Sequence, residues 1–272
     1  PFNFKNIRFL LNEYVDNNSV ILDKIAFSIT NDLINKFKTK EELFKNYPLV
    51  LTTLKVIFFN HQIANSRVGM KFVAATTKKA TNHYCWLSVA SADLSKLEIL
   101  NKKTILYFLD LAISNCLKMN GSDEFRFEEF SQKYFVSFVS KYPKEIYKIC
   151  YTNLTKVINK SRYSDYNLSG DCFEIISKNN DSGYYMFNSQ KKIIKWMLEA
   201  LDKIEDNEWI INEFNKNVKS DNKFEKRLSI YISNKKILFM KERFIKNINK
   251  FANIDCYSEI YSLLKSNKMA FT

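Results

Sequence analysis

Residues 55–90 read KVIFFNHQIANSRVGMKFVAATTKKATNHYCWLSVA, and this stretch determines both the expected fold and the expected chemistry. It lies in a longer window, 45–92, that holds no Asp or Glu. A solvated surface ordinarily mixes both signs of charge, so a window of this length without a carboxylate indicates a surface that faces an anion. Its cations are Lys45, Lys55, Arg67, Lys71, Lys78 and Lys79.

Aromatic and amide side chains are interleaved with these cations. Lys and Arg neutralise phosphate charge, aromatic rings accept stacked bases, and amides pair with base edges. We therefore expect single-stranded nucleic acid as the partner, with Asn60, Tyr84 and Trp86 near the bases. Most aromatic residues of the window should still be core, because burial is their commoner fate.

Composition points to helices. The chain is 46% apolar and 15% aromatic. This apolar content is enough to form a hydrophobic core and is higher than that of disordered proteins. Only 4 Gly and 3 Pro in 272 residues disfavour sandwiches and barrels, which need many turns. We predict a mainly α, two-lobed fold with one small β-hairpin in the N-terminal lobe and with terminal arms.

The hairpin is the predicted exception to the helices. Apolar residues alternate over 68–76, which predicts one strand, and the short aromatic run YCWLSVA over 84–90 predicts the other. The polar residues between them would form the tip. That placement would let Lys78 and Lys79 reach a ligand.

Apolar spacing of three to four residues predicts helices elsewhere. Ser95 and Glu98 fit a capping box at the start of one of them, and Pro48 would close or kink another. The predicted ranges are 18–37, 39–48, 49–65, 95–119, 125–142, 144–159, 188–202, 206–219 and 223–251.

The clearest break in the chain is MNGSDE, residues 119–124, so we place the boundary between two lobes near Gly121. Because residue 1 is Pro rather than Met, we expect a segment to precede it. The predicted division is an N-terminal arm with the start of the first lobe (1–18), an N-terminal lobe (19–120), a C-terminal lobe (121–251) and a C-terminal arm or helix (252–272).

A net charge of +13 favours an acidic partner: nucleic acid, an anionic membrane surface or an acidic protein. Three further intervals, 146–164, 182–198 and 226–241, also lack Asp and Glu. Together with the first window they would line one continuous groove. The candidate phosphate-binding residues that they add are Lys148, Lys156, Arg162, Lys191, Lys192 and Lys195.

No catalytic pattern stands out. The motifs GxxxxGK[ST], GxGxxG, GxSxG and HExxH are absent. His83 and Cys85 would share one face of a strand, but a metal site needs further ligands that no spacing nominates. Five widely spaced cysteines indicate free thiols in a reducing compartment, and no apolar run reaches transmembrane length. We expect no enzymatic activity, no cofactor, no metal and no membrane span.

Three segments, in this order, resemble motifs of one protein family. KVIFFNHQIANS (55–66) resembles an asparagine-centred motif with Asn60 on the Asn, and ADLSKLEIL (92–100) resembles a short motif that opens the next helix. GYYMF (183–187) resembles a third motif built on Gly-Tyr and Phe. The family is that of nucleoproteins of segmented negative-strand RNA viruses of the bunyavirus order, and the chain is most similar to those of plant-infecting emaraviruses.

The resemblance implies a protein that coats genomic single-stranded RNA independent of sequence, in a positive groove between two lobes, with Tyr184 also near RNA. It implies rings or filaments formed by exchange of terminal arms, a viral polymerase as a further partner, and a location in the virion ribonucleoprotein and the host cytoplasm. The residues expected in arm contacts are Phe2, Phe4, Ile260, Leu263 and Leu264.

Two other functions remain open. A helical effector or interaction module that binds an acidic protein would keep the basic surface without arms or RNA. A nuclease or another enzyme could assemble its site from residues that no spacing links.

Overall fold

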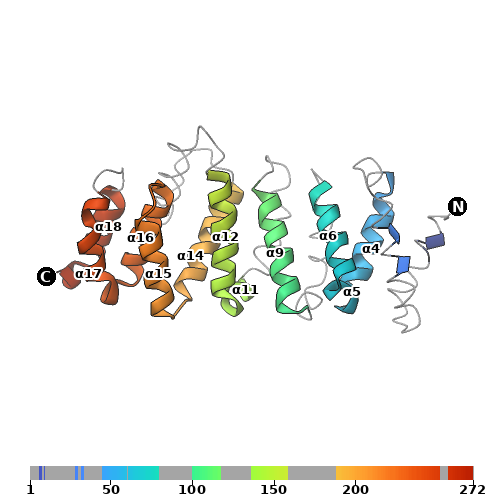
Figure 1. The fold of residues 1–272 in the computed structure, drawn as a ribbon, viewed down its shortest axis with the longest axis horizontal. Coiled ribbons are helices and arrows are strands. Elements are labelled where there is room, and N and C mark those ends of the chain that lie inside the picture. The colour runs from blue at the N-terminus through green and yellow to red at the C-terminus, as the bar shows by residue number, and fades with distance from the viewer. Residues whose placement is uncertain are drawn as a thin grey trace. The chain divides into compact units, whose positions relative to one another are not determined.

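A computed structural model gives the fold of the chain (Figure 1). It describes residues 6–7, 9, 28–29, 32–33, 45–59, 61–79, 100–117, 136–158, 188–251 and 257–271. Within these ranges the regular structure is helical and no strand occurs, which agrees with the predicted mainly α class. The chain divides into two compact units, Pro1–Phe138 and Val139–Thr272.

The first unit contains four helices of three or more residues within its described part, and α11 (Val136–Lys141) spans the division between the units. The four are α4 (Tyr47–Phe59), α5 (His61–Asn65), α6 (Arg67–Lys79) and α9 (Lys102–Cys116). Helix α6 packs against α4, α5 and α9.

The turn from α5 into α6 is tight. Ser66 caps α6, because its Oγ accepts a hydrogen bond of 3.1 Å from the Gly69 N–H while its hydroxyl donates to the Ile63 carbonyl at 2.6 Å. A Cβ on Gly69 would lie 2.1 Å from that same Ile63 oxygen. Glycine is therefore what lets the backbones of α5 and α6 approach this closely.

The predicted strand over 68–76 is wrong, because these residues lie inside α6. The apolar alternation that suggested a strand also fits a helix, since short apolar runs are ambiguous between the two. Phe72 and Val73 are buried on one side of α6, while Arg67 and Lys71 are exposed. Lys78 and Lys79 thus end a helix and do not sit on a hairpin tip; the second predicted strand, 84–90, lies outside the described residues.

The second unit is built from helix pairs. Helix α12 packs against α14, α15 against α16, and α16 against both α17 and α18. Tyr147, Phe214, Phe224 and Phe244 are among its largest fully buried side chains. Its helices are α12 (Pro143–Ile158), α14 (Asn188–Asp202), α15 (Asn207–Val218), α16 (Lys223–Lys235), α17 (Ile237–Asn247), the 3-10 turn η2 (Ile248–Lys250), α18 (Tyr257–Ser266) and α19 (Lys268–Phe271).

Most helices predicted in this half are confirmed, and the predicted range 188–202 coincides with α14. Two details in the first unit are corrected. Pro48 belongs to the first turn of α4, where its missing N–H costs nothing, and not to the last turn of the helix predicted over 39–48, most of which lies outside the described residues. Helix α9 begins at Lys102 after Asn101, whose Oδ1 accepts from the Thr104 N–H at 2.9 Å; the capping box at Ser95 lies outside the described residues.

Several other predictions fall outside the described part of the chain. They concern the lobe boundary near Gly121, most of the helix over 18–37, and the site residues Phe2, Phe4, Asn60, Tyr84, Trp86, Arg162 and Tyr184. For Lys78, Lys79 and Lys191 the backbone is helical and the side chain lies outside the description.

Candidate nucleic-acid interface

Helix α6 has a basic side. Arg67 and Lys71 are exposed one turn apart, and neither forms an ion pair with a described residue. Around a helix axis, residues four positions apart differ in direction by about 40°, and residues eleven positions apart differ by about 20°. Lys71 is four and Lys78 eleven positions after Arg67, so the Cα of Lys78 lies in the same sector of α6. The buried Phe72 and Val73 lie roughly opposite. Correcting the hairpin to a helix thus aligns the backbone positions of three candidate cations along one side of α6.

The acid-free window puts no carboxylate on the helices that carry these cations. Helices α4, α5 and α6 contain no Asp or Glu, and α4 adds the exposed Lys55. Cations without local acidic neighbours keep their full charge toward solvent. Such a surface attracts anions more strongly than one in which both signs alternate.

The candidate lysines of the second unit lie on two packed helices, α12 and α14. Lys148 and Lys156 are exposed on α12, and Lys192 is half-buried on α14. Lys195 is exposed but lies 3.9 Å from the Glu199 carboxylate one turn on. That pairing offsets part of its charge. The strongest candidates here are therefore Lys148 and Lys156.

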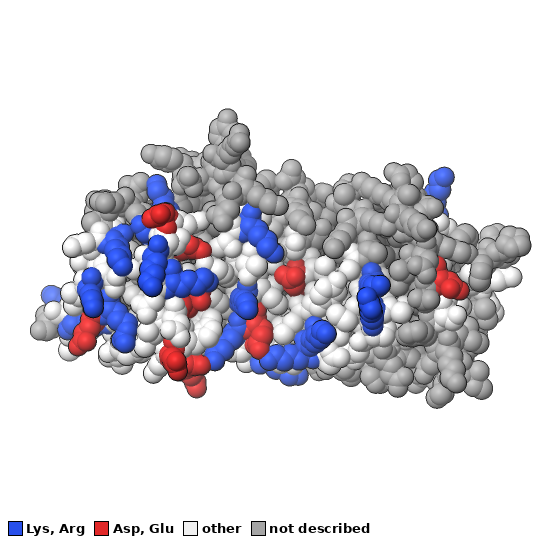
Figure 2. Space-filling model, in the orientation of Figure 1, with Lys and Arg blue, Asp and Glu red and all other residues white. Residues whose placement is uncertain are grey.

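Figure 2 shows Lys and Arg spread widely over the visible face of the described C-terminal helices, with Asp and Glu between them. On this face the second unit does not present one uniform basic sheet. Anion binding on this face therefore depends on the individual Lys and Arg side chains that form no ion pair with a nearby Asp or Glu.

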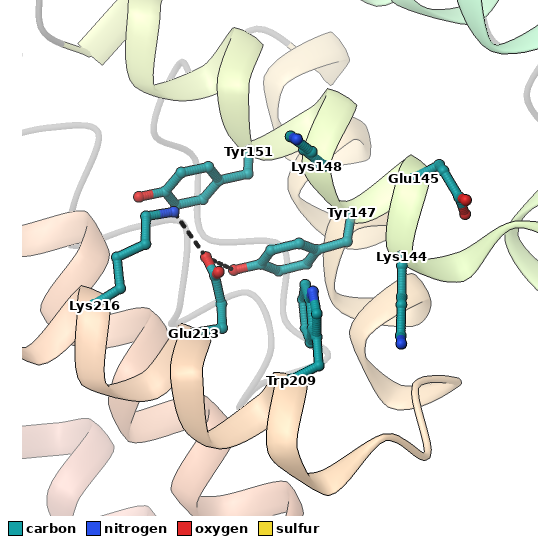
Figure 3. A pocket seen from close by; sticks show the side chains of 8 residues that line it. All are labelled: Lys144, Glu145, Tyr147, Lys148, Tyr151, Trp209, Glu213 and Lys216. Atoms are coloured by element: carbon teal, nitrogen blue, oxygen red, sulfur yellow. Dashed lines mark hydrogen bonds and ion pairs between the residues drawn. The ribbon is translucent and has the colours of Figure 1, made fainter. Parts of the chain in front are cut away.

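A pocket of about 290 Å³ lies between α12 and α15 (Figure 3). Its walls combine aromatic rings with both signs of charge. Tyr147 and the partly exposed Trp209 meet edge to face, with ring centroids 5.1 Å apart and an interplanar angle of 87°. The lining residues are Lys144, Glu145, Tyr147, Lys148, Tyr151, Trp209, Glu213 and Lys216.

Two tyrosines of α12 hold carboxylates of the neighbouring helices. The Tyr147 hydroxyl donates to Glu213 Oε1 at 3.0 Å, and the Tyr151 hydroxyl donates to Glu225 Oε1. Burial raises the pKa of Tyr147 well above its usual range, and the charge of Glu213 raises it further. Burial also raises the pKa of Tyr151, with the hydrogen bond to Glu225 as the next cause. Both phenols therefore act as neutral donors.

Two of the three pocket lysines are already paired. Lys144 lies 2.5 Å from Asp206 Oδ2, and Lys216 lies 3.1 Å from Glu213 Oε1 and 4.0 Å from the centroid of the Tyr151 ring. The hydrogen bond from Lys144 lowers the pKa of Asp206, and the bond from the Trp209 N–H lowers it further. Lys148 forms no ion pair or hydrogen bond with any described residue and is exposed.

Of these pocket residues only Lys148 was expected from the sequence. The sequence does hold a signal for four of them, because the i, i+3, i+4, i+7 spacing of one helix face connects Lys144, Tyr147, Lys148 and Tyr151. Trp209 and Glu213 come from α15, about 60 residues on, and no local spacing connects them to α12.

The predicted arm residues of the C-terminal segment differ in exposure. Leu263 is fully buried, Ile260 is half-buried, and Leu264 is 39% exposed. The Glu259 carboxylate lies 3.2 Å from Arg227 Nε, and both side chains are largely buried. Helix α18 is therefore docked on α16 of its own chain.

Within the described ranges, no three His, Cys, Asp or Glu side chains gather closely enough to hold a metal ion. None of the described helices combines the length and the apolar character that a bilayer crossing requires. Comparison with known proteins adds no relative: no protein-family model, no curated protein and no solved structure matches the chain.

Proposed function

We propose that this protein binds and coats single-stranded RNA without regard to sequence, as the resemblance to bunyavirus-order nucleoproteins implies. The observation that carries the proposal is the basic side of α6, with exposed Arg67 and Lys71 in a window of helices free of carboxylates. Lys55 on α4 and Lys148 and Lys156 on α12 supply further exposed cations.

The lack of sequence preference follows from the kind of contact. Phosphate contacts fix position but carry no base information, and stacking tolerates every base. Coating also requires self-association, which the proposal assigns to the chain ends. The large apolar side chains exposed on α18 and α19 support this part, because exposed apolar surface favours protein contacts; they are Tyr261, Leu264 and Met269.

The test is the affinity for unrelated single-stranded RNA oligonucleotides as a function of salt, compared between the native chain and Arg67→Gln/Lys71→Gln. Each phosphate contact contributes roughly 0.7 to the log–log slope on single strands, so losing two contacts should lower the slope by about 1.4. We expect the same loss on every sequence, since these residues would touch only phosphates.

A matched control removes the same charge elsewhere. Lys246 and Lys250 are exposed and also four residues apart, but lie at the end of α17 and in η2, outside the proposed surface. Lys246→Gln/Lys250→Gln should keep the native slope. Equal slopes for both double variants would assign binding to net charge alone and contradict the proposed surface. Weak binding that is flat with salt would reject RNA and favour an acidic protein partner.

A further inference from the structure

The pocket between α12 and α15 has a chemistry that general phosphate binding does not need. It combines a partly exposed indole, a lysine without an ion pair among the described residues, and two carboxylates, Glu145 and Glu213, within one cavity (Figure 3). A volume of about 290 Å³ lies at the lower end of the range for small-ligand sites, which suits a single nucleotide.

The aromatic part of the pocket is preorganised. Tyr147 is 1% exposed and is held by its hydrogen bond to Glu213, so it forms a fixed wall. Trp209 packs edge to face against it and remains partly exposed. Asp206, which caps α15 and pairs with Lys144, fixes the start of the helix that carries Trp209. A planar base stacks on such an indole without reorganising the pocket.

The polar part of the pocket offers Glu213 as a hydrogen-bond acceptor and Lys148 as a cation. Glu213 Oε1 already accepts from Tyr147 and Lys216, and a carboxylate has further lone pairs to offer. Guanine presents two adjacent donors, N1–H and N2–H, whereas the single N3–H of uracil is flanked by two carbonyl oxygens that a carboxylate repels. Lys148, which is unpaired among the described residues, remains for a phosphate.

We propose that this pocket is a subsite for one nucleoside monophosphate unit, with the base on Trp209 and Glu213 and the phosphate on Lys148, and with a preference for guanine over uracil. The inference rests on the proposed function, because its natural ligand would be one nucleotide of the bound RNA. The preference applies to one subsite, so the many phosphate contacts still leave overall coating almost independent of sequence.

The experiment is isothermal titration of the full chain with GMP, UMP, guanosine and inorganic phosphate. We expect saturable binding in the order GMP, then UMP and guanosine, with phosphate weakest. Trp209→Ala should weaken GMP binding by roughly 5- to 150-fold, the range that a stacked base supplies, and Trp209→Phe should restore most of it. Lys148→Gln should weaken GMP but leave guanosine unchanged, since guanosine carries no phosphate.

Lys219→Gln is the control, because Lys219 is an exposed cation that follows α15 and lies outside the pocket lining. Absence of saturable GMP binding, or equal affinity of the native chain and Trp209→Ala, overturns the subsite. Equal affinity for GMP and UMP overturns the role of Glu213. If Trp209→Ala binds RNA at native strength, the bound RNA does not occupy this pocket, and the coating function stands without the subsite. If the chain binds GMP but not RNA, the pocket binds nucleotides and the coating function is rejected.

Discussion

Gly69 on α6 lies directly against the carbonyl oxygen of Ile63 on α5, so closely that a Cβ would lie 2.1 Å from that oxygen. The contact joins two backbones, and neither can swing aside as a long side chain could. The orientation of the basic side of α6 therefore depends on a residue that carries no charge.

Gly69→Ala should destabilise the protein. Ala is ordinarily the better helix former by about 1 kcal/mol, but the added methyl would force α5 and α6 apart, and overpacking of this kind costs roughly 1–3 kcal/mol. We therefore expect urea unfolding to give a lower free energy of unfolding for Gly69→Ala than for the native chain. Lys71→Ala, at an exposed position of the same helix, should change stability by less than about 0.5 kcal/mol. A Gly69→Ala protein more stable than the native chain would contradict the close contact.

The hydrogen bond between Tyr147 and Glu213 predicts a second stability effect. Tyr147→Phe removes the donor and leaves Glu213, whose side chain is 12% exposed, with Lys216 as its remaining partner. The expected cost is about 1–3 kcal/mol, the penalty for a buried acceptor that loses a hydrogen bond. Thermal denaturation measures it. Tyr261→Phe is the comparison, because Tyr261 is 65% exposed and should show almost no change.

Three tyrosines predict the response to alkaline pH. Burial raises the pKa of Tyr147, Tyr151 and Tyr231, and in each case a nearby carboxylate raises it further; for Tyr231 that carboxylate is Asp202. A folded-state pKa above the unfolded value of about 10 means that the stabilisation is complete below pH 10 and is lost as pH rises above it.

Phenolate absorbance during an alkaline titration checks this effect. A fraction of the tyrosine signal should be missing until the chain unfolds, and it should then appear in one step with the loss of helical circular dichroism. Replacing Tyr231 by Phe should reduce that delayed step. If every tyrosine ionised near pH 10 in the folded protein, the buried phenol–carboxylate pairs would be refuted.

The buried ion pair between Arg227 and Glu259 predicts how α18 is held on α16. Glu259→Ala would leave the Arg227 charge buried, and breaking such a pair by removing one partner costs roughly 3–5 kcal/mol. The double replacement Arg227→Met/Glu259→Leu should recover most of the loss, because it leaves no buried charge.

Urea unfolding and limited proteolysis near residue 257 measure this effect together. Ser266→Ala, at an exposed position of the same helix, should behave like the native chain. A Glu259→Ala protein as stable as the native chain, with α18 equally protected, would show that Leu263 and its apolar contacts hold the helix without the ion pair.

The sequence alone determined the helices whose apolar spacing is long and regular. The range 188–202 was predicted with the bounds of α14, and 144–159 differs from α12 by one residue at each end. Over a dozen or more residues the periodicity of 3.6 separates clearly from the periodicity of two, so local pattern suffices.

Only the tertiary structure decided the conformation of 68–76 and the pocket. A short run of alternating apolar residues fits a strand or a helix. The helix is selected by two tertiary contacts: Gly69 packs against Ile63, and α6 packs against α9. The pocket joins Tyr147 to Trp209 and Glu213 across two helices far apart in sequence. Local sequence carries periodicity, whereas the meeting of distant side chains depends on which helices pack together, and that is decided by the free energy of the whole core.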